Sequence, residues 1–192
     1  MIKMIHPLLF FLFSVYTINV FAQDHPWSLN VSSLTTVDDN FMSNHSSHFD
    51  VGLKRNTFYL EDMRIAFGGN IGSLSREFAP DQYVYTFVLQ PKIYAEVDLE
   101  VLNRIKPRIG VGYSFLVAVP VQNISMYSED EVLETTVQGG IGTNIGLTVG
   151  ISDRIFVHVD YDFIKLDKDK EVKDISYNRN INFLKFGLGF TF

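Results

Sequence analysis

Apolar and polar residues alternate along most of the chain, and this alternation is the main structural signal in the sequence. Between Val137 and Val149, apolar or small residues occupy the odd positions, and polar residues or glycines occupy the even ones. Segments 106–119, 155–166 and 180–192 alternate in the same way. Because successive side chains of a strand point to opposite faces, a period of two predicts strands with one apolar and one polar face. The sequence therefore predicts an all-β protein.

The alternation predicts eight strands, an even number that can close into an antiparallel barrel. Their ranges are 26–35, 47–57, 61–74, 82–98, 106–119, 132–150, 155–166 and 180–192. The connections after the odd-numbered strands are polar and mostly longer (36–46, 75–81, 120–131 and 167–179), whereas those after the even-numbered strands are mostly short. Long loops at one end and short turns at the other are typical of outer-membrane barrels. Pro91 lies within a predicted strand without an N–H for the ladder, so we expect a bulge or a local irregularity there.

Alternation alone does not decide which face meets lipid, because a soluble lipocalin-like barrel would turn its apolar face inward. Three features favour a membrane barrel. The apolar face carries many aromatic residues, several near predicted strand ends, where they suit a membrane interface. The predicted strands are also longer than the roughly 3–10 residues usual in soluble proteins. The opposite face combines glycines with charged residues, which would make a poor apolar core. We therefore expect the apolar face to point outward into lipid.

One stretch, 109–128, has no charged residue and is long enough for a transmembrane helix. Its β-branched residues, its period of two, Gly110, Gly112 and Pro120 favour a strand instead.

The first 22 residues have the features of a secretory signal peptide. Lys3 precedes an apolar segment at 8–13, and Val20-Phe21-Ala22 places small residues at the −3 and −1 positions of a cleavage site. We therefore predict a signal peptide over 1–22 and a barrel domain over 23–192. The chain has 16 Lys and Arg against 22 Asp and Glu, so removal of Lys3 leaves a net charge of 15 − 22 = −7. An acidic chain is a poor ligand for nucleic acid, and the absence of cysteine excludes disulfides and thiolate sites.

Two segments near the end of the chain resemble a known family. The last residues, NFLKFGLGFTF, are apolar at every second position, and the segment GGIGTNIGLTVGISDRIFVHVDYDFIKL has a glycine-rich strand, a short turn and a strand ending in aromatic residues. Together they resemble the final strands of small bacterial outer-membrane barrels of the OmpA and OmpX type. The resemblance implies an eight-stranded antiparallel transmembrane β-barrel in the bacterial outer membrane. It implies contact with outer-membrane lipid and lipopolysaccharide. It also implies recognition by the barrel insertion machinery through Phe186, Leu188, Phe190 and Phe192.

The predicted inner face carries a set of charged and titratable side chains, which we interpret as a lumenal charge network. They are Arg64, Lys92, Glu96, Asp98, Arg108, His158, Asp160, Asp162 and Lys185. The estimated strand register places Glu96 opposite Arg108 and Asp162 close to Lys185. Arg64 and Lys92 would then balance Asp98 and Asp160. Paired charges and small residues would fill a narrow eight-stranded lumen, so we expect no open pore.

The sequence identifies no catalytic residue, cofactor or metal site, and it favours a structural role or a binding role of the surface loops. One alternative is an outer-membrane lipid-modifying enzyme of the lipid A deacylase or acyltransferase type, because His158 shares its face with Asp160 and Asp162. Such an enzyme needs a serine paired with histidine where an acyl chain can reach, and no serine accompanies His158. The other alternative is a soluble secreted ligand binder.

Overall fold

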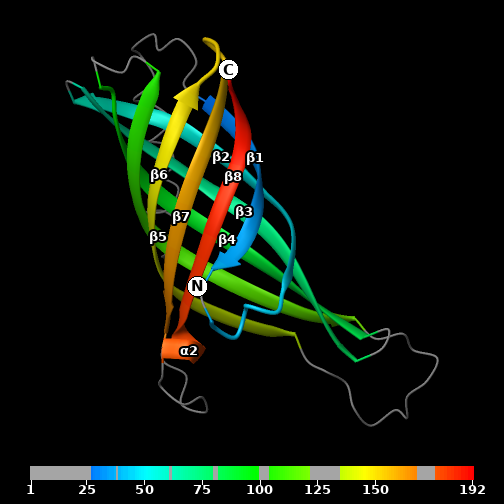
Figure 1. The fold of residues 1–192 in the computed structure, drawn as a ribbon. Helices are drawn as coiled ribbons and strands as arrows, with labels where there is room; N and C mark the ends of the chain where they lie inside the picture. The colour runs from blue at the N-terminus through cyan, green and yellow to red at the C-terminus, as the bar shows by residue number, and fades with distance from the viewer. Residues whose placement is uncertain are drawn as a thin grey trace, which may run out of the picture.

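The chain closes into a single antiparallel barrel. The computed structural model describes residues 27–37, 39–60, 62–79, 82–99, 104–121, 135–167 and 176–192. Within these residues, eight strands follow one another around the barrel in sequence order, and the last pairs with the first (Figure 1). The elements are β1 (Trp27–Val37), β2 (Ser46–Leu60), β3 (Met63–Ala79), β4 (Gln82–Val97), β5 (Ile105–Val121), β6 (Thr136–Gly150), β7 (Ile155–Leu166), the short helix α2 (Ser176–Arg179) and β8 (Asn180–Thr191). The predicted eight-stranded antiparallel barrel is confirmed, and the predicted signal peptide lies outside the described residues.

Strands β3 and β5 are longer than predicted. β3 continues to Ala79 and β4 begins at Gln82, so most of the predicted loop 75–81 is strand. The polar residues at this end of β3 lie opposite residues of β4 that favour strands, as Ser75 lies opposite Tyr85 in the ladder. This pairing extends β3 beyond its predicted end. β5 continues to Val121, so residues 109–121 form a strand and not part of a helix. Within the described part of the chain, no helix is long and apolar enough to cross a membrane.

The barrel has two different ends. We call the end with the β2–β3, β4–β5 and β6–β7 connections the short-turn end. The first and last strands also meet there, because Trp27 and Phe192 exchange backbone hydrogen bonds of 3.1 and 2.9 Å. We call the opposite end the long-loop end, and β3, β4 and β5 project beyond the other strands there (Figure 1). In outer-membrane barrels the short turns face the periplasm.

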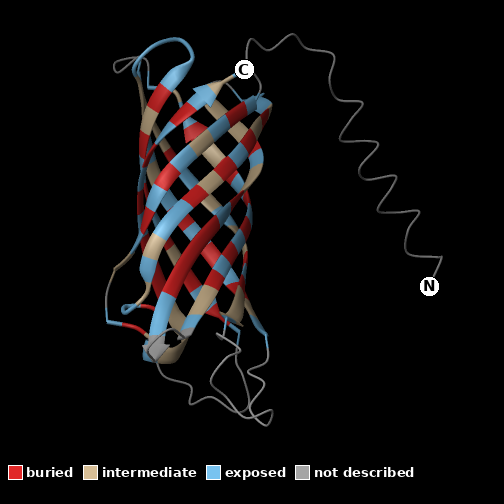
Figure 2. Ribbon diagram, turned by 90° about the vertical axis from the view of Figure 1, so that its right-hand side faces the viewer, coloured by how far each residue is buried: buried red, intermediate tan, exposed pale blue. Residues whose placement is uncertain are grey.

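The apolar face of the strands points outward. Ile145, Ile109 and Phe186 on this face are 67%, 62% and 61% exposed, whereas Lys185 and Asp160 on the other face are 2% and 3% exposed. Exposed and buried residues alternate along the strands in Figure 2. An apolar exterior around a polar interior is the arrangement of a membrane barrel. This contradicts the soluble lipocalin-like alternative, which would place the apolar face inside.

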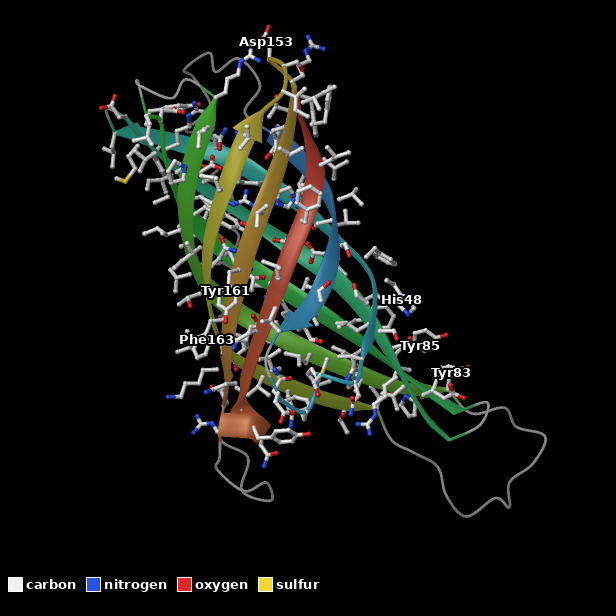
Figure 3. All side chains as sticks on the ribbon, viewed as in Figure 1. His48, Tyr83, Tyr85, Asp153, Tyr161 and Phe163 are labelled. Atoms are coloured by element: carbon white, nitrogen blue, oxygen red, sulfur yellow. The ribbon has the colours of Figure 1, made fainter. Side chains whose placement is uncertain are left out.

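Aromatic side chains lie toward both ends of the outer surface. At the short-turn end, the guanidinium of Arg55 lies 5.2 Å from the ring of Trp27. Tyr83 and Tyr85 lie toward the long-loop end, whereas Tyr161 is closer to the middle of the barrel (Figure 3). The outer surface therefore has aromatic residues where a membrane interface would contact it.

The ladder between β4 and β5 is irregular at Pro91, as the sequence predicted, but no register shift occurs there. Register pairs stop at Leu89 and resume at Lys92 in the same register. A side chain at Gly112 would overlap the carbonyl oxygen of Pro91, so glycine allows β5 to approach β4 this closely. Register shifts occur elsewhere, at Ser47/Phe49 and Asn56/Phe58 in the β2–β3 ladder and at Glu77/Ala79 in the β3–β4 ladder.

Candidate functional site: the interior of the barrel

The middle of the lumen contains equal numbers of buried positive and negative side chains. All of them are less than a tenth exposed: Lys54, Lys92, Arg108 and Lys185, with Asp50, Glu96, Asp160 and Asp162. They come from five strands, β2, β4, β5, β7 and β8. A buried charge without a partner is strongly destabilising, so these eight side chains can be buried together only because positive and negative charges are equal in number. The network is neutral as a whole.

Lys185 lies at the centre of the part of the network nearer the long-loop end. Its Nζ is 2.8 Å from Asp50 Oδ2 and 3.0 Å from Asp162 Oδ2, and it donates to Gln90 Oε1 at 2.7 Å. Lys92 Nζ contacts the other oxygen of Asp162 at 2.7 Å. Four strands therefore meet through one lysine and its acceptors.

Arg108 and Asp160 form a two-point ion pair nearer the short-turn end. Arg108 Nε donates to Asp160 Oδ1 at 2.8 Å, and Arg108 Nη2 donates to Asp160 Oδ2. His158 Nδ1 lies 2.6 Å from the same Oδ2, and its Nε2 lies 3.4 Å from the amide nitrogen of Asn30. His158 Nδ1 also lies 3.2 Å from Arg108 Nη2. Both nitrogens of His158 are thus engaged within the network.

Three ion pairs continue the network toward the short-turn end. Lys54 Nζ lies 2.5 Å from Glu96 Oε1. Asp98 accepts from Arg64 Nε at 2.5 Å and lies 3.2 Å from Lys106 Nζ. The side chain of Asp98 is 35% exposed, so this last group is at the mouth of the barrel and not in its buried middle.

The structure brings most of the residues named from the sequence together, with one different pairing. Glu96 lies opposite Arg108 in the ladder, although their charged groups are 4.0 Å apart. Lys92 was expected to balance Asp160 but contacts Asp162 instead. The reason is that Arg108 already occupies both carboxylate oxygens of Asp160.

Sequence reasoning missed two of the eight buried charges in the middle of the lumen, Asp50 and Lys54. A signal for both was available. Phe49, Val51 and Leu53 are the alternating apolar positions of the predicted strand 47–57, so the period of two places Asp50 and Lys54 on the opposite, inner face.

The lumen at the long-loop end is apolar, which the sequence analysis did not predict. Its buried cluster contains Leu34, Met42, Leu74, Val88, Leu116, Ile164, Leu166, Ile181 and Phe183. Met42 belongs to the β1–β2 connection and is 1% exposed, and its N–H donates to Asn40 Oδ1 at 2.8 Å. The expectation of glycines and charges throughout the lumen was therefore wrong at this end, where the inward positions of the strand ends carry large apolar side chains under a loop residue.

Little space remains among the buried charges. The void beside Asn144 and Asp162 measures about 10 Å³, close to the minimum that holds one water molecule. A larger cavity of about 100 Å³ lies at the short-turn end. Across the described strands and connections, no group of three or more histidine and acidic side chains is arranged to hold a metal ion.

A serine–histidine pair that the sequence did not indicate lies on the outward side of the barrel wall, with His48 exposed and Ser75 only 8% exposed. His48 Nε2 is 2.8 Å from Ser75 Oγ, and the His48 ring stacks on Tyr85 with 6.2 Å between centroids. His48 is the extra residue of the register shift between Ser47 and Phe49, and such irregularities change where a side chain points. His48, Tyr85 and Tyr83 follow one another toward the long-loop end in Figure 3.

Comparisons with known proteins support the fold. No protein-family model matches the chain, and no curated protein matches it in sequence. Among solved structures, Neisserial surface protein A is similar with a TM-score of 0.56 and 14% identity, over 87% of this chain and 97% of that one. Ail of Yersinia pestis, in complex with the heparin analogue sucrose octasulfate, is similar with a TM-score of 0.58 and 9% identity, over 86% and 96% of the two chains. The N-terminal β-barrel domain of OprF from Pseudomonas aeruginosa is similar with a TM-score of 0.50 and 11% identity, over 88% and 100%.

The chain therefore has the fold of small bacterial outer-membrane barrels. These neighbours and the apolar outer surface both agree with the predicted location in the outer membrane.

Proposed function

We propose that this protein is a non-conducting outer-membrane barrel whose role is structural or is carried by its long-loop end. The observation that supports this most directly is the filled lumen. A neutral network of four cations and four anions occupies the middle, and an apolar cluster lies between it and the long-loop end. An ion entering the lumen would have to displace paired charges and then cross apolar side chains, both at high cost in free energy.

Conductance measurements test the closed lumen. The purified protein is reconstituted into planar bilayers and its current is recorded across a range of voltages. We expect no stable current step above the bilayer background. A reproducible ohmic channel would overturn the proposal.

The projecting ends of β3, β4 and β5 support an interaction role for the long-loop end. These three strands extend farther than the others at the long-loop end, and Tyr83 and Tyr85 lie on the outer face of this extension (Figures 1 and 3). Ail, which shares the fold, was solved with a highly sulfated ligand. This chain has a net charge of −6, so long-range attraction to a polyanion of that kind is not expected here. We propose a surface partner that is not polyanionic.

The exposed band of apolar side chains supports contact with outer-membrane lipid, including lipopolysaccharide at the long-loop end. The terminal strand supports recognition by the insertion machinery. Phe186, Leu188, Phe190 and Phe192 are all outward and 42–61% exposed. They therefore form a continuous row of apolar side chains on the outer face of β8, which an insertion factor could contact.

A lipid-modifying activity is the second candidate, and the His48–Ser75 pair is the observation that favours it. A serine beside a histidine on the outer surface is the arrangement that a nucleophile and its base require. Against this activity, the contacts of His48 within the described residues are to Ser75 and to the Tyr85 ring, with no carboxylate orienting the imidazole. We therefore propose that the protein is not an enzyme.

Mass spectrometry of lipid A separates the two candidates. Lipid A is compared between cells that express the wild type, Ser75→Ala or His48→Ala and cells without the gene. We expect the same lipid A masses in all four. A mass change that depends on both Ser75 and His48 would favour the enzyme.

A further inference from the structure

The cavity at the short-turn end has the features of a ligand site and lies where the ion-pair network ends, away from the apolar cluster. Its volume is about 100 Å³, and the turn between β6 and β7 forms part of its wall. The Lys54–Glu96 ion pair and the ring of Phe156 also line it. Asp153 lies at the tip of that turn, at the extreme end of the barrel (Figure 3). The cavity therefore lies at the mouth of the lumen on the side of the short turns.

Two buried polar atoms in the wall of this cavity lack partners. Asn56 and Thr148 are each 8% exposed, and both line the cavity. Among the described residues, neither Asn56 Oδ1 nor Thr148 Oγ1 has a hydrogen-bond partner. Buried polar atoms are nearly always hydrogen-bonded, so these two atoms call for a group inside the cavity. Asn56 Oδ1 requires a donor, whereas the Thr148 hydroxyl can donate or accept.

The charges around the cavity favour an anion. Four cationic side chains line it, namely Lys54, Arg64, Lys106 and Arg154, against two carboxylates, Glu96 and Asp153. Glu96 is already bound by Lys54 at 2.5 Å. Arg64 and Lys106 share the single carboxylate of Asp98, which stands beside the cavity. Arg154 has no ion-pair partner within the described part of the chain. Even with Asp98 counted, the four cations exceed the three carboxylates.

We propose that this cavity binds a small oxyanion that also carries a hydroxyl group, of the size and chemistry of hydrogen phosphate. The anionic oxygens would face Arg154, the Arg64 and Lys106 pair, and the Thr148 hydroxyl. The remaining O–H would donate to Asn56 Oδ1. The ligand is a soluble anion and not a lipid headgroup, because the wall of strands separates the cavity from the surrounding bilayer.

Isothermal titration calorimetry of the purified protein in detergent micelles tests this site. The probes are inorganic phosphate and sulfate at pH 7 and equal ionic strength. Sulfate has a similar size and charge but no O–H at this pH, so it cannot donate to Asn56. We expect saturable binding of phosphate and binding of sulfate weaker by about tenfold or more, the effect of losing one hydrogen bond that involves a charged group.

Three variants locate the binding. Arg154→Gln and Thr148→Val each remove one proposed contact and should weaken phosphate binding by about tenfold. Arg76→Gln makes the same charge change as Arg154→Gln on an exposed arginine of β3 at the opposite end, so it should leave binding unchanged. Heat-modifiable migration on gels verifies that each variant is folded. Absence of saturable phosphate binding, or equal affinity in Arg154→Gln and Arg76→Gln, would overturn the site. Equal affinity for sulfate would overturn the role of Asn56.

Discussion

Replacing Lys185 with methionine tests whether charge balance holds the lumen together. Methionine fills a similar volume but removes the positive charge that contacts Asp50 and Asp162. Lys92 would still contact Asp162 at 2.7 Å, but Asp50, which is 1% exposed, would lose its ion-pair partner. Because an unpaired carboxylate would remain buried, we expect the free energy of unfolding to fall by about 3–5 kcal/mol.

Equilibrium unfolding in urea measures this loss. Trp27 is the only tryptophan, and it lies on the outer face of β1, so its fluorescence reports the transfer from lipid or detergent to water. The matched control is Lys165→Met, which removes an exposed lysine of β7 at the long-loop end. Its effect should stay within about 0.5 kcal/mol.

A second substitution separates charge balance from simple loss of contacts. Asp50→Asn in the Lys185→Met background removes the unpaired carboxylate and leaves three buried cations with three buried anions. The double variant should therefore recover part of the lost stability, with a coupling free energy of about 1–3 kcal/mol between the two sites. The reasoning is refuted if Lys185→Met costs less than about 1 kcal/mol, or if the two single losses simply add.

Three further outcomes are expected. Leu147→Arg, on the lipid face near the short-turn end of β6, should lower the free energy of unfolding by about 1–3 kcal/mol. Thr148→Arg, beside the cavity, should cost less, and equal losses in urea unfolding would contradict the assigned faces. In Gly146→Ala, the added methyl group would overlap the Asp160 carboxylate and the Arg108 guanidinium, so the free energy of unfolding should fall by about 1–3 kcal/mol. In Gly150→Ala, the nearest atoms to the added methyl group are 3.8 Å away, so the free energy of unfolding should hardly change. Phe192→Ser should reduce the heat-modifiable folded fraction in cells but not after refolding in detergent, because only cells contain the insertion machinery. Equal losses in both would mean that the substitution impairs folding itself and not recognition by that machinery.

The first of these comparisons shows what the tertiary structure adds. From the sequence alone, Asn144 is the natural lumenal position to compare with Leu147. In the structure Asn144 is 3% exposed and donates to Asp162 at 2.7 Å, with a void of only about 10 Å³ beside it. An arginine there would collide with the network, so the neighbouring Thr148, which lines the larger cavity, is the better choice.

The sequence by itself determined the strands, their number and their two faces. A period of two is a local property, and each strand repeats it, so the closed barrel with apolar residues outside could be predicted without any contact being known. The same alternation placed Arg108, Asp160 and Lys185 inside. It was weaker at the strand ends, where polar residues such as Ser75 and Arg76 are compatible with either a loop or a strand.

Only the tertiary structure decided which inner residues meet. Lys92 contacts Asp162 and not Asp160, and Lys185 joins Asp50, which is 135 positions away in sequence. The reason is physical: period two fixes which face a side chain occupies, whereas a buried ion pair depends on barrel closure and on which partners are already taken. The apolar cluster, the irregularity that places His48 beside Ser75, and the cavity at the short-turn end depend on the same three-dimensional arrangement of strands.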